Sequence, residues 1–263
     1  MIARPHLLIT TLLASVWLAG CSPQGVRDTP DSDVTGELGS PLAVQSPADV
    51  YIQLSGAYLQ EGRLDEALRN AKKAVLVDPS SSNAQYIYAL VQQRLGQTES
   101  AGEAYRRAVS LDPHNPDALN AYGLYLCSKQ RYEEADAHFR RALANPLYKT
   151  PWLVMHNAGY CLQQAGKTAD AESDYRAALQ RNPRFAPSLL AMAELSFDQG
   201  IYLSARAYLQ RYAEVAPHTA ESLWLGIRTE NQMGNRRQMA SYRQELLSRF
   251  PDSDEAKYLQ SIE

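Results

Sequence analysis

Residues 82–113 read SNAQYIYALVQQRLGQTESAGEAYRRAVSLDP, and this arrangement recurs along most of the chain with a period of 34 residues. Each copy closes near a proline, and the recurring prolines are Pro79, Pro113, Pro183, Pro217 and Pro251. The 70 residues between Pro113 and Pro183 hold two copies with a two-residue insertion near Pro146. The repeat frames begin at Ala48, Ser82, Pro116, Trp152, Ala186 and Ala220. Because self-similarity at one fixed period marks stacked repeats, the chain is expected to form a solenoid.

Small side chains occupy fixed places in each copy. Position 8 is Ser55, Ala89, Gly123, Gly159 and Ala193, position 20 is Ala67, Ala101, Ala135, Ala171 and Ala205, and position 27 is Ala74, Ala108, Ala142 and Ala178. This is the tetratricopeptide signature, in which each repeat is two antiparallel helices, here called A and B, packed about 8–10 Å apart. The sequence predicts an all-α, right-handed superhelical solenoid of six tetratricopeptide repeats over residues 47–251. A non-repetitive helical bundle is the alternative.

The turns and the end of the solenoid also carry signals. Glycines that end A helices in left-handed caps are Gly62, Gly96, Gly166, Gly200 and Gly234. Repeat 3 has Lys129-Gln130-Arg131 instead, so its turn is expected to be less regular. The sixth repeat has Ile227, Met239 and Leu246 where other repeats have small residues, which fits a terminal position. Residues 252–263 predict a capping helix, with Tyr258, Leu259 and Ile262 covering the last apolar surface.

The N-terminus predicts export and lipidation. Residues 1–20 resemble a signal peptide, with an apolar run too short to span a bilayer permanently. They end in Leu18-Ala19-Gly20-Cys21, which resembles a bacterial lipobox, so Cys21 is the expected lipidation site. An ordinary signal peptide with a chance cysteine is the alternative. By resemblance to enteric lipoproteins, Ser22 favours the outer membrane, and residues 21–46 form a flexible linker rich in Pro, Gly, Ser and Asp.

Composition and motifs favour binding over catalysis. A net charge of -3 and a pI of about 6.0 give no electrostatic reason to expect nucleic acid. The sequence has no His-Glu-x-x-His pair, nucleophile elbow or phosphate loop, so no enzyme activity, cofactor, metal or small-molecule substrate is expected. We expect His114 and His218 to be solvated, His138 to lie on the surface, and His156 to face a binding groove.

The groove is predicted from the repeat register. Side chains at positions 2, 5, 9 and 12 of the A helices usually point into the concave face of such solenoids. The residues that we place there are Ile52, Leu59, Tyr86, Leu90, Asn120, Leu124, His156, Tyr160, Leu190, Phe197 and Trp224. Their apolar and aromatic character predicts a protein-binding groove. The alternative is that many of them are half-buried between neighbouring A helices.

Cys127 and Cys161 remain once Cys21 is lipidated. They occupy position 12 of repeat 3 and position 10 of repeat 4, in neighbouring A helices. An even pair in an oxidising compartment favours a disulfide, and this placement makes one feasible. Two buried free thiols are the alternative, and we expect the disulfide.

The junction of repeats 3 and 4 is similar to a known family. The residues that carry the resemblance are Asn120-Ala121-Tyr122-Gly123, Leu126-Cys127, Arg131-Tyr132-Glu133-Glu134-Ala135, Phe139, Ala142-Leu143-Ala144-Asn145-Pro146-Leu147-Tyr148, Thr150-Pro151 and Asn157-Ala158-Gly159-Tyr160-Cys161. This run resembles the type IV pilus biogenesis lipoproteins of the PilF/PilW pilotin family, with small departures at Asn145 and Lys149. The lipobox and six repeats extend the resemblance over essentially the whole chain.

The resemblance implies a function. Such pilotins help the pilus secretin subunit reach the outer membrane and multimerise, which pilus biogenesis and twitching motility require. We therefore expect a periplasm-facing, lipid-anchored outer-membrane protein whose partner is the secretin. One alternative is a repeat lipoprotein that serves outer-membrane protein assembly or peptidoglycan enzymes. The other is an enzyme, for which the sequence offers no catalytic constellation.

Overall fold

The computed structural model describes residues 46–261, which form thirteen α-helices and no strand. The A helices are α1 (Pro47–Gln60), α3 (Ser82–Arg94), α5 (Pro116–Ser128), α7 (Pro151–Gln164), α9 (Ala186–Asp198) and α11 (Ala220–Gln232). The B helices are α2 (Leu64–Val77), α4 (Thr98–Leu111), α6 (Tyr132–Leu143), α8 (Thr168–Arg181), α10 (Tyr202–Ala213) and α12 (Arg236–Arg249). Helix α13 (Asp254–Ser261) follows them. The predicted signal peptide, the expected lipidation site Cys21 and the predicted linker up to residue 45 lie outside the described residues.

Several A helices begin where side chains satisfy free backbone amides. Ser46 accepts a hydrogen bond from the Asp49 amide, and the Asp49 carboxylate accepts one from the Ser46 amide. Asn115 caps α5 by accepting from the amide of Ala118, 3.1 Å away. The Asn115 Nδ2 also donates to Ser82 Oγ at 2.9 Å, so this cap fastens repeat 3 to repeat 2.

The A–B turns share one geometry, including the turn that was expected to differ. The five turn glycines have φ between 68° and 75°, and Gln130 takes the same place in repeat 3 with φ 60°. The Gln130 amide donates to Cys127 O at 2.8 Å, and the Arg131 amide donates to Leu126 O at 3.0 Å. Repeat 2 makes the equivalent pair of bonds at Gly96 and Gln97. The prediction of a less regular turn was therefore wrong, because the hydrogen bonds hold Gln130 in the left-handed region.

The small side chains pack the helices together as predicted. The alanines at positions 20 and 27 are fully buried: Ala67, Ala101, Ala135, Ala171, Ala205, Ala74, Ala108, Ala142 and Ala178. Ser55 is also fully buried, and its Oγ donates to Ala67 O at 2.9 Å across the first hairpin. A Cβ on Gly123 would lie 2.6 Å from Cε1 of Phe139, so glycine is needed where α5 meets that ring. The predicted all-α solenoid of tetratricopeptide hairpins is confirmed.

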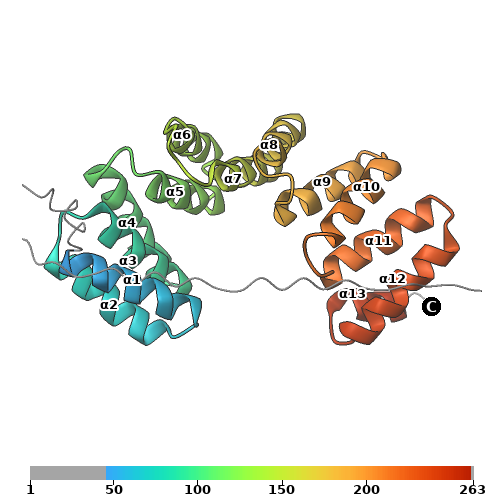
Figure 1. Cartoon of the computed structure of the whole chain (residues 1–263), viewed down its shortest axis with the longest axis horizontal. Coiled ribbons are helices and arrows are strands. Elements are labelled where there is room, and N and C mark those ends of the chain that lie inside the picture. The colour runs from blue at the N-terminus through green and yellow to red at the C-terminus, as the bar shows by residue number, and fades with distance from the viewer. Residues whose placement is uncertain (1–45, 262–263) are drawn as a thin grey trace, which may run out of the picture. The chain divides into compact units, whose positions relative to one another are not determined.

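Successive hairpins of the described domain follow an arc, in which α5, α7 and α9 lie nearer the inner side and α6 and α8 nearer the outer side (Figure 1). At its C-terminal end, α13 packs on α11 and α12, with Leu259 buried against the cluster that contains Leu223 and Leu246. Tyr258 was expected to help cover the last apolar surface, and 56% of the residue itself faces solvent. Its ring meets Trp224 edge-on at 5.4 Å. Ile262 lies outside the described residues.

Within residues 46–261, no helix combines the length and the apolar character that crossing a membrane requires.

Candidate protein-binding groove

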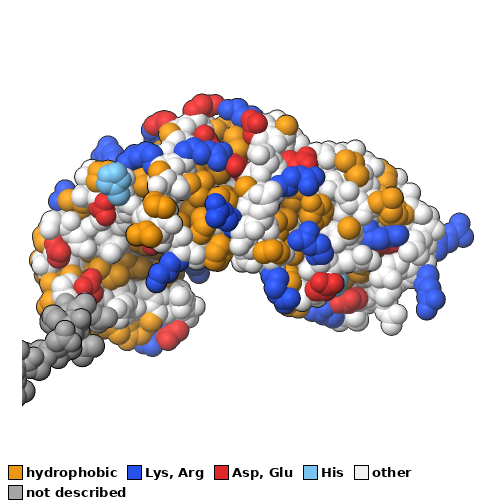
Figure 2. Space-filling model, turned by 45° about the horizontal axis from the view of Figure 1, so that its top comes forward, with side chains coloured by type: hydrophobic (Ala, Val, Ile, Leu, Met, Phe, Trp, Pro, Cys, Tyr) orange, Lys and Arg blue, Asp and Glu red, His pale blue; other side chains and the backbone are white. Residues whose placement is uncertain are grey.

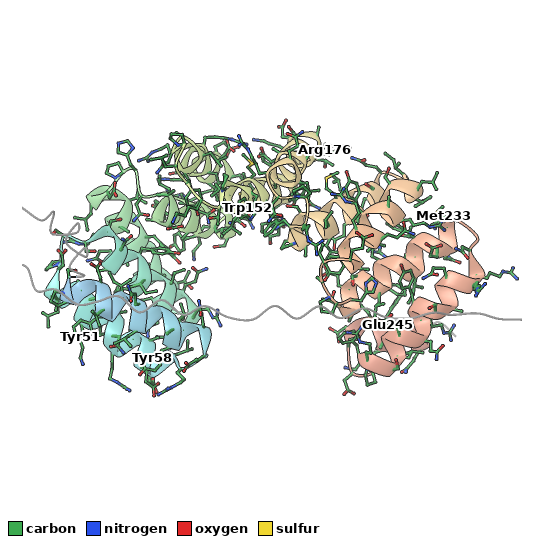
Figure 3. All side chains as sticks on the ribbon, viewed as in Figure 1. Tyr51, Tyr58, Trp152, Arg176, Met233 and Glu245 are labelled. Atoms are coloured by element: carbon green, nitrogen blue, oxygen red, sulfur yellow. A yellow bond between two sulfur atoms is a disulfide. The ribbon has the colours of Figure 1, made fainter. Side chains whose placement is uncertain are left out.

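The predicted groove residues lie along the A helices, whose register places them towards the inner side of the arc. Figure 3 shows Trp152 of α7 on that side, whereas Arg176 of α8 lies on the outer side. We use "the groove" for the eleven residues that were predicted from the register. Their environments divide them into an N-terminal set on repeats 1–3 and a C-terminal set on repeats 4–6.

The N-terminal set is packed into the core more than it lines an open surface. Its five apolar members are half-buried: Ile52, Leu59, Tyr86, Leu90 and Leu124. Burial raises the pKa of Tyr86 to about 12, with smaller contributions from Asp117 and Tyr148. The Tyr148 hydroxyl reaches back from the insertion between repeats 3 and 4 and donates to Asp117 Oδ1 at 2.8 Å. The insertion is therefore held against the start of α5.

Asn120 does not line the groove, so its assignment was wrong. It is only 8% exposed, and its Oδ1 accepts a hydrogen bond at 2.9 Å from Nδ2 of Asn157 on α7. A buried amide requires such a partner because its desolvation is otherwise uncompensated. The repeat register gave the position of Asn120 but did not reveal its partner 37 residues further on. Its role is to join repeats 3 and 4.

The C-terminal set borders an open cavity of about 380 Å³ between α7, α9 and α11. The structure brings together here three predicted residues, His156, Tyr160 and Leu190. Tyr160 is the most open of them, with 47% of its surface exposed. The remaining lining residues are Gln163, Gln164, Tyr175, Pro187, Ala191, Glu194 and Glu221.

His156 forms a wall of this cavity and is held in place by three neighbours. Its Nδ1 lies 3.1 Å from Ser188 Oγ, and its ring centroid lies 5.4 Å from Tyr175 and 5.5 Å from Phe185. Burial lowers the pKa of His156 to about 4. The imidazole is therefore neutral at physiological pH and contributes an aromatic surface rather than a positive charge.

Glu194 and Glu221 are functional candidates that the sequence interpretation missed. They occupy position 9 of repeat 5 and position 2 of repeat 6, both within the register used to predict the groove. Burial raises the pKa of Glu194 to about 7, helped by the charge of Glu221 and a hydrogen bond with it. Their register positions were the sequence signal for both carboxyl groups.

Phe197 and Trp224 continue the same face beyond the cavity. The guanidinium of Arg228 lies 4.6 Å from the centroid of the Phe197 ring and 5.9 Å from that of Trp224. Both rings are half-buried. This end of the groove is thus a stacked aromatic and cationic surface.

The other histidines deviate from expectation in two places. His114 is exposed, as predicted. His218, expected to be solvated, is half-buried between Tyr212 and Tyr242. Its ring centroid lies 6.0 Å from that of Tyr212 and 5.6 Å from that of Tyr242. His138 is half-buried as well, with its ring edge-on to Tyr122 at 4.8 Å. Both rings fill interhelical space.

Cys127 and Cys161 form a disulfide in the structure, with Cα atoms 5.7 Å apart. Both residues are buried, at 5% and 2% exposure. The bond joins α5 to α7 on either side of the insertion, close to the Asn120–Asn157 hydrogen bond. Repeats 3 and 4 are therefore fastened by one covalent and one polar link.

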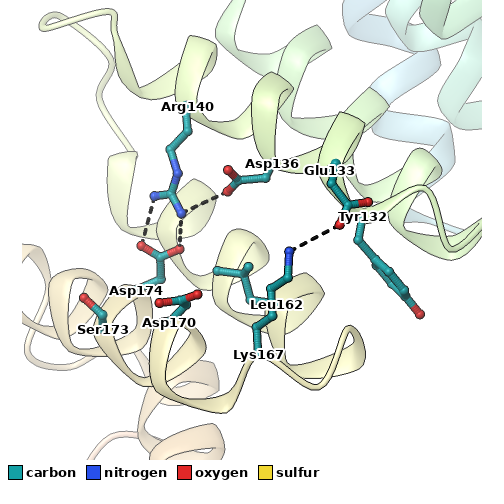
Figure 4. Close-up of a pocket in the computed structure, with 9 residues that line it drawn as sticks. All are labelled: Tyr132, Glu133, Asp136, Arg140, Leu162, Lys167, Asp170, Ser173 and Asp174. Carbon is teal, nitrogen blue, oxygen red and sulfur yellow. Dashed lines mark hydrogen bonds and ion pairs between the residues drawn. The ribbon is translucent and has the colours of Figure 1, made fainter.

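A second, polar cleft lies between the B helices of the same two repeats (Figure 4). Arg140 donates two hydrogen bonds to Asp174, at 3.0 and 2.6 Å, and forms an ion pair with Asp136 at 2.9 Å. Lys167 pairs with Glu133 at 3.3 Å. These ion pairs link repeats 3 and 4 across the cleft.

A further apolar opening of about 320 Å³ lies away from the groove and is lined by Gly200, Ile201, Tyr202, Leu203 and Met233. On the face that Figure 2 shows, apolar side chains form separate patches with Lys and Arg between them. Across residues 46–261, no group of three or more His, Cys, Asp or Glu side chains is arranged to hold a metal ion.

Comparison with known proteins gives the family of the chain. A family model for the tetratricopeptide repeat matches residues 54–116, 89–148 and 157–219. The type IV pilus assembly protein PilF of Pseudomonas aeruginosa is 32% identical over 249 residues, which cover 95% of this chain and 96% of PilF. The chain belongs to the PilF/PilW family. It is a tetratricopeptide-repeat protein of type IV pilus assembly.

Two solved structures of the PilF/PilW family superpose on the domain. The Pseudomonas aeruginosa PilF structure gives a TM-score of 0.74 at 34% identity, covering 82% of this chain and 97% of that one. The structure of PilW, a widely conserved type IV pilus biogenesis factor, gives a TM-score of 0.76 at 28% identity, covering 82% of this chain and 99% of PilW. The predicted family resemblance is confirmed.

Proposed function

We propose that this chain is a pilotin that binds the type IV pilus secretin subunit and promotes its outer-membrane localisation and multimerisation. In this proposal Cys21 carries the lipid that anchors the chain in the outer membrane, facing the periplasm. Pilus biogenesis and twitching motility then depend on it. The observation that carries the proposal is the match to PilF along 95% of the chain, because it includes the repeats and the N-terminal region together.

The groove supports binding rather than catalysis. Its C-terminal set presents Tyr160, Phe197 and Trp224, and aromatic side chains of this kind anchor protein interfaces. The neutral His156 is packed between the rings of Tyr175 and Phe185, and its Nδ1 contacts Ser188 Oγ. We infer a protein partner held along the A helices, with the lipid raising the local concentration of the complex at the membrane.

A pull-down from detergent-solubilised membranes tests the partner. The full-length chain should recover the secretin, whereas recovery of barrel-assembly proteins or peptidoglycan enzymes in its place would refute the pilotin proposal. A Cys21→Ser variant should fold and still bind the secretin but leave the secretin mislocalised. Normal secretin rings in that variant would refute the lipid anchor as the address.

A matched pair of substitutions tests the surface. Tyr160→Ala removes an open aromatic ring from the groove, and we expect secretin affinity to fall about tenfold, a typical loss at an interface anchor. Leu203→Ala removes a side chain that is 70% exposed on α10, outside the groove, and should leave the affinity unchanged. If the Tyr160→Ala and Leu203→Ala variants bound the secretin with equal affinity, the binding surface would not include the cavity between α7, α9 and α11.

A further inference from the structure

The cavity between α7, α9 and α11 carries an unbalanced negative charge. Glu194 and Glu221 line it, and none of the described residues lining it is a lysine or arginine. Glu221 lies in the first turn of α11. Glu194 lies on α9 within hydrogen-bonding reach of it. Two acidic groups from neighbouring repeats therefore meet at one opening.

The surrounding groups do little to neutralise this pair. Asp198, one turn further along α9, adds negative charge, and Arg228 on α11 is the cation whose field opposes it. The Arg228 guanidinium makes cation–π contacts instead, 4.6 Å from the centroid of the Phe197 ring and 5.9 Å from that of Trp224. Burial is the main cause of the rise in the pKa of Glu194 to about 7, and the neighbouring acidic groups add to it. In the free protein, the pair holds a proton near neutral pH that a cation could replace.

The walls of the cavity suit an organic cation. His156 and Tyr160 supply aromatic rings, and the almost fully buried Tyr175 packs against the His156 ring. Burial keeps the pKa of Tyr175 above its ordinary range, so it stays neutral. Leu190 and Pro187 add apolar surface for a hydrocarbon stem. A positive head beside two carboxylates and against ring faces gains both charge pairing and cation–π attraction. A volume of about 380 Å³ also lies within the range of ligand-binding clefts.

We propose that this cavity receives an arginine or lysine side chain that projects from the bound segment of the protein partner. The inference rests on the proposed function, because it assumes that a partner segment runs along the groove. It adds the chemistry of one contact: a basic residue, flanked by apolar residues that meet Tyr160 and Trp224. Arginine fits best, since its planar guanidinium can stack on a ring and bridge two carboxylates.

The test compares two charge-removing double variants of the full-length chain in detergent. Glu194→Gln with Glu221→Gln neutralises the cavity, and Glu214→Gln with Asp252→Asn removes two exposed carboxylates elsewhere. The probes are the purified secretin subunit and a pair of peptides, acetyl-Leu-Ala-Arg-Ala-Leu-amide and its citrulline counterpart, which keeps the shape but loses the charge. Calorimetric titration at pH 8 gives the affinities, and circular dichroism checks that each variant is folded.

We expect the cavity variant to bind the secretin and the arginine peptide about tenfold more weakly, whereas the control variant matches the wild type. The wild type should prefer the arginine peptide over the citrulline peptide. Unchanged affinities in the folded cavity variant would overturn the inference while leaving secretin binding by the wild type intact. An arginine preference that the cavity variant loses, with no secretin binding by the wild type, would uphold the inference and refute the proposed partner.

Discussion

Asn157 of α7 donates a hydrogen bond to Asn120 of α5 across the junction where the 34-residue period is interrupted. The two side chains are 9% and 8% exposed, so neither can exchange its partner for bulk water. The insertion shifts repeat 4 relative to repeat 3, and this polar contact is one of the features that fix the new register.

Asn157→Ala should lower the free energy of unfolding by about 1–3 kcal/mol, because it leaves the Asn120 oxygen buried without a donor. Urea denaturation followed by circular dichroism measures the change. Gln180→Ala, at an exposed position on α8, should shift the midpoint little and serves as the control. Replacing both asparagines by alanine should lower the free energy of unfolding by less than the sum of the two single changes. Strict additivity would show that the two amides do not interact.

Replacing both Cys127 and Cys161 by serine should lower the free energy of unfolding by about 3–4 kcal/mol in the chain-entropy description of a loop of this length. The oxidised wild type and this variant are compared in urea, with and without reductant. Reductant should move the wild type towards the variant and leave the variant unchanged. A wild type that is insensitive to complete reduction would contradict a stabilising role for the bond.

Two glycines of the A helices should respond in opposite directions to alanine. Gly123→Ala forces a Cβ to within 2.6 Å of the fully buried Phe139 ring, so we expect a loss of about 1–3 kcal/mol from overpacking. Gly56→Ala meets only Ile87, at 3.9 Å, and should gain up to about 1 kcal/mol from helix propensity. Thermal unfolding of the two variants measures both effects. The same sign for both would contradict the packing assigned to Phe139.

Glu194→Gln should stabilise the protein at pH 8 and have little effect at pH 4.5. The pKa of Glu194 in the folded chain, about 7, lies above its ordinary value, so the folded state binds a proton that the unfolded chain has released. Wild-type stability from this group is therefore present at low pH and declines as the pH rises from about 4.5 through 7. The variant has no such group, so the difference in Tm between the two proteins should grow over that range.

His156 contributes the opposite trend, because its pKa in the folded chain is lowered from the ordinary histidine value to about 4. The stability that this group contributes is therefore lost as the pH falls below the ordinary pKa of histidine towards 4. This trend is common to the wild type and the Glu194→Gln variant, so it cancels in their difference. Glu214→Gln is the control for losing one exposed negative charge. If the Tm difference between the wild type and Glu194→Gln stayed constant from pH 4.5 to 8, the raised pKa assigned to Glu194 would be contradicted.

The fold could be predicted because the repeat makes each signal appear several times. Helices α3, α5, α9 and α11 begin at the frame positions that the proline spacing gave, and α1 and α7 begin one residue earlier. Gln130 shows where such reasoning is limited. A left-handed residue other than glycine costs roughly 1–2 kcal/mol, and the hydrogen-bonded turn of a packed hairpin outweighs that cost.

The candidate site was only partly predictable. Register placed His156, Tyr160 and Leu190 beside one cavity, since residues at equivalent positions of stacked helices become neighbours. It could not distinguish Asn120, which turns to a buried partner, from Tyr160, which remains open. It also could not show that Glu194 and Glu221 meet, because that contact joins different positions of two repeats. Pairwise contacts of this kind depend on how far one hairpin rotates against the next, which periodicity leaves undetermined.

Helix α13 makes the two ends of the solenoid unequal. Ala256 and Leu259 seal the final hairpin, while Val50 and Leu54 remain exposed at the first, at 44% and 40%. Two copies therefore cannot join head to tail, because the tail no longer offers the surface that another repeat would recognise. Open-ended polymerisation of the described domain through stacking of repeats is blocked by the same helix.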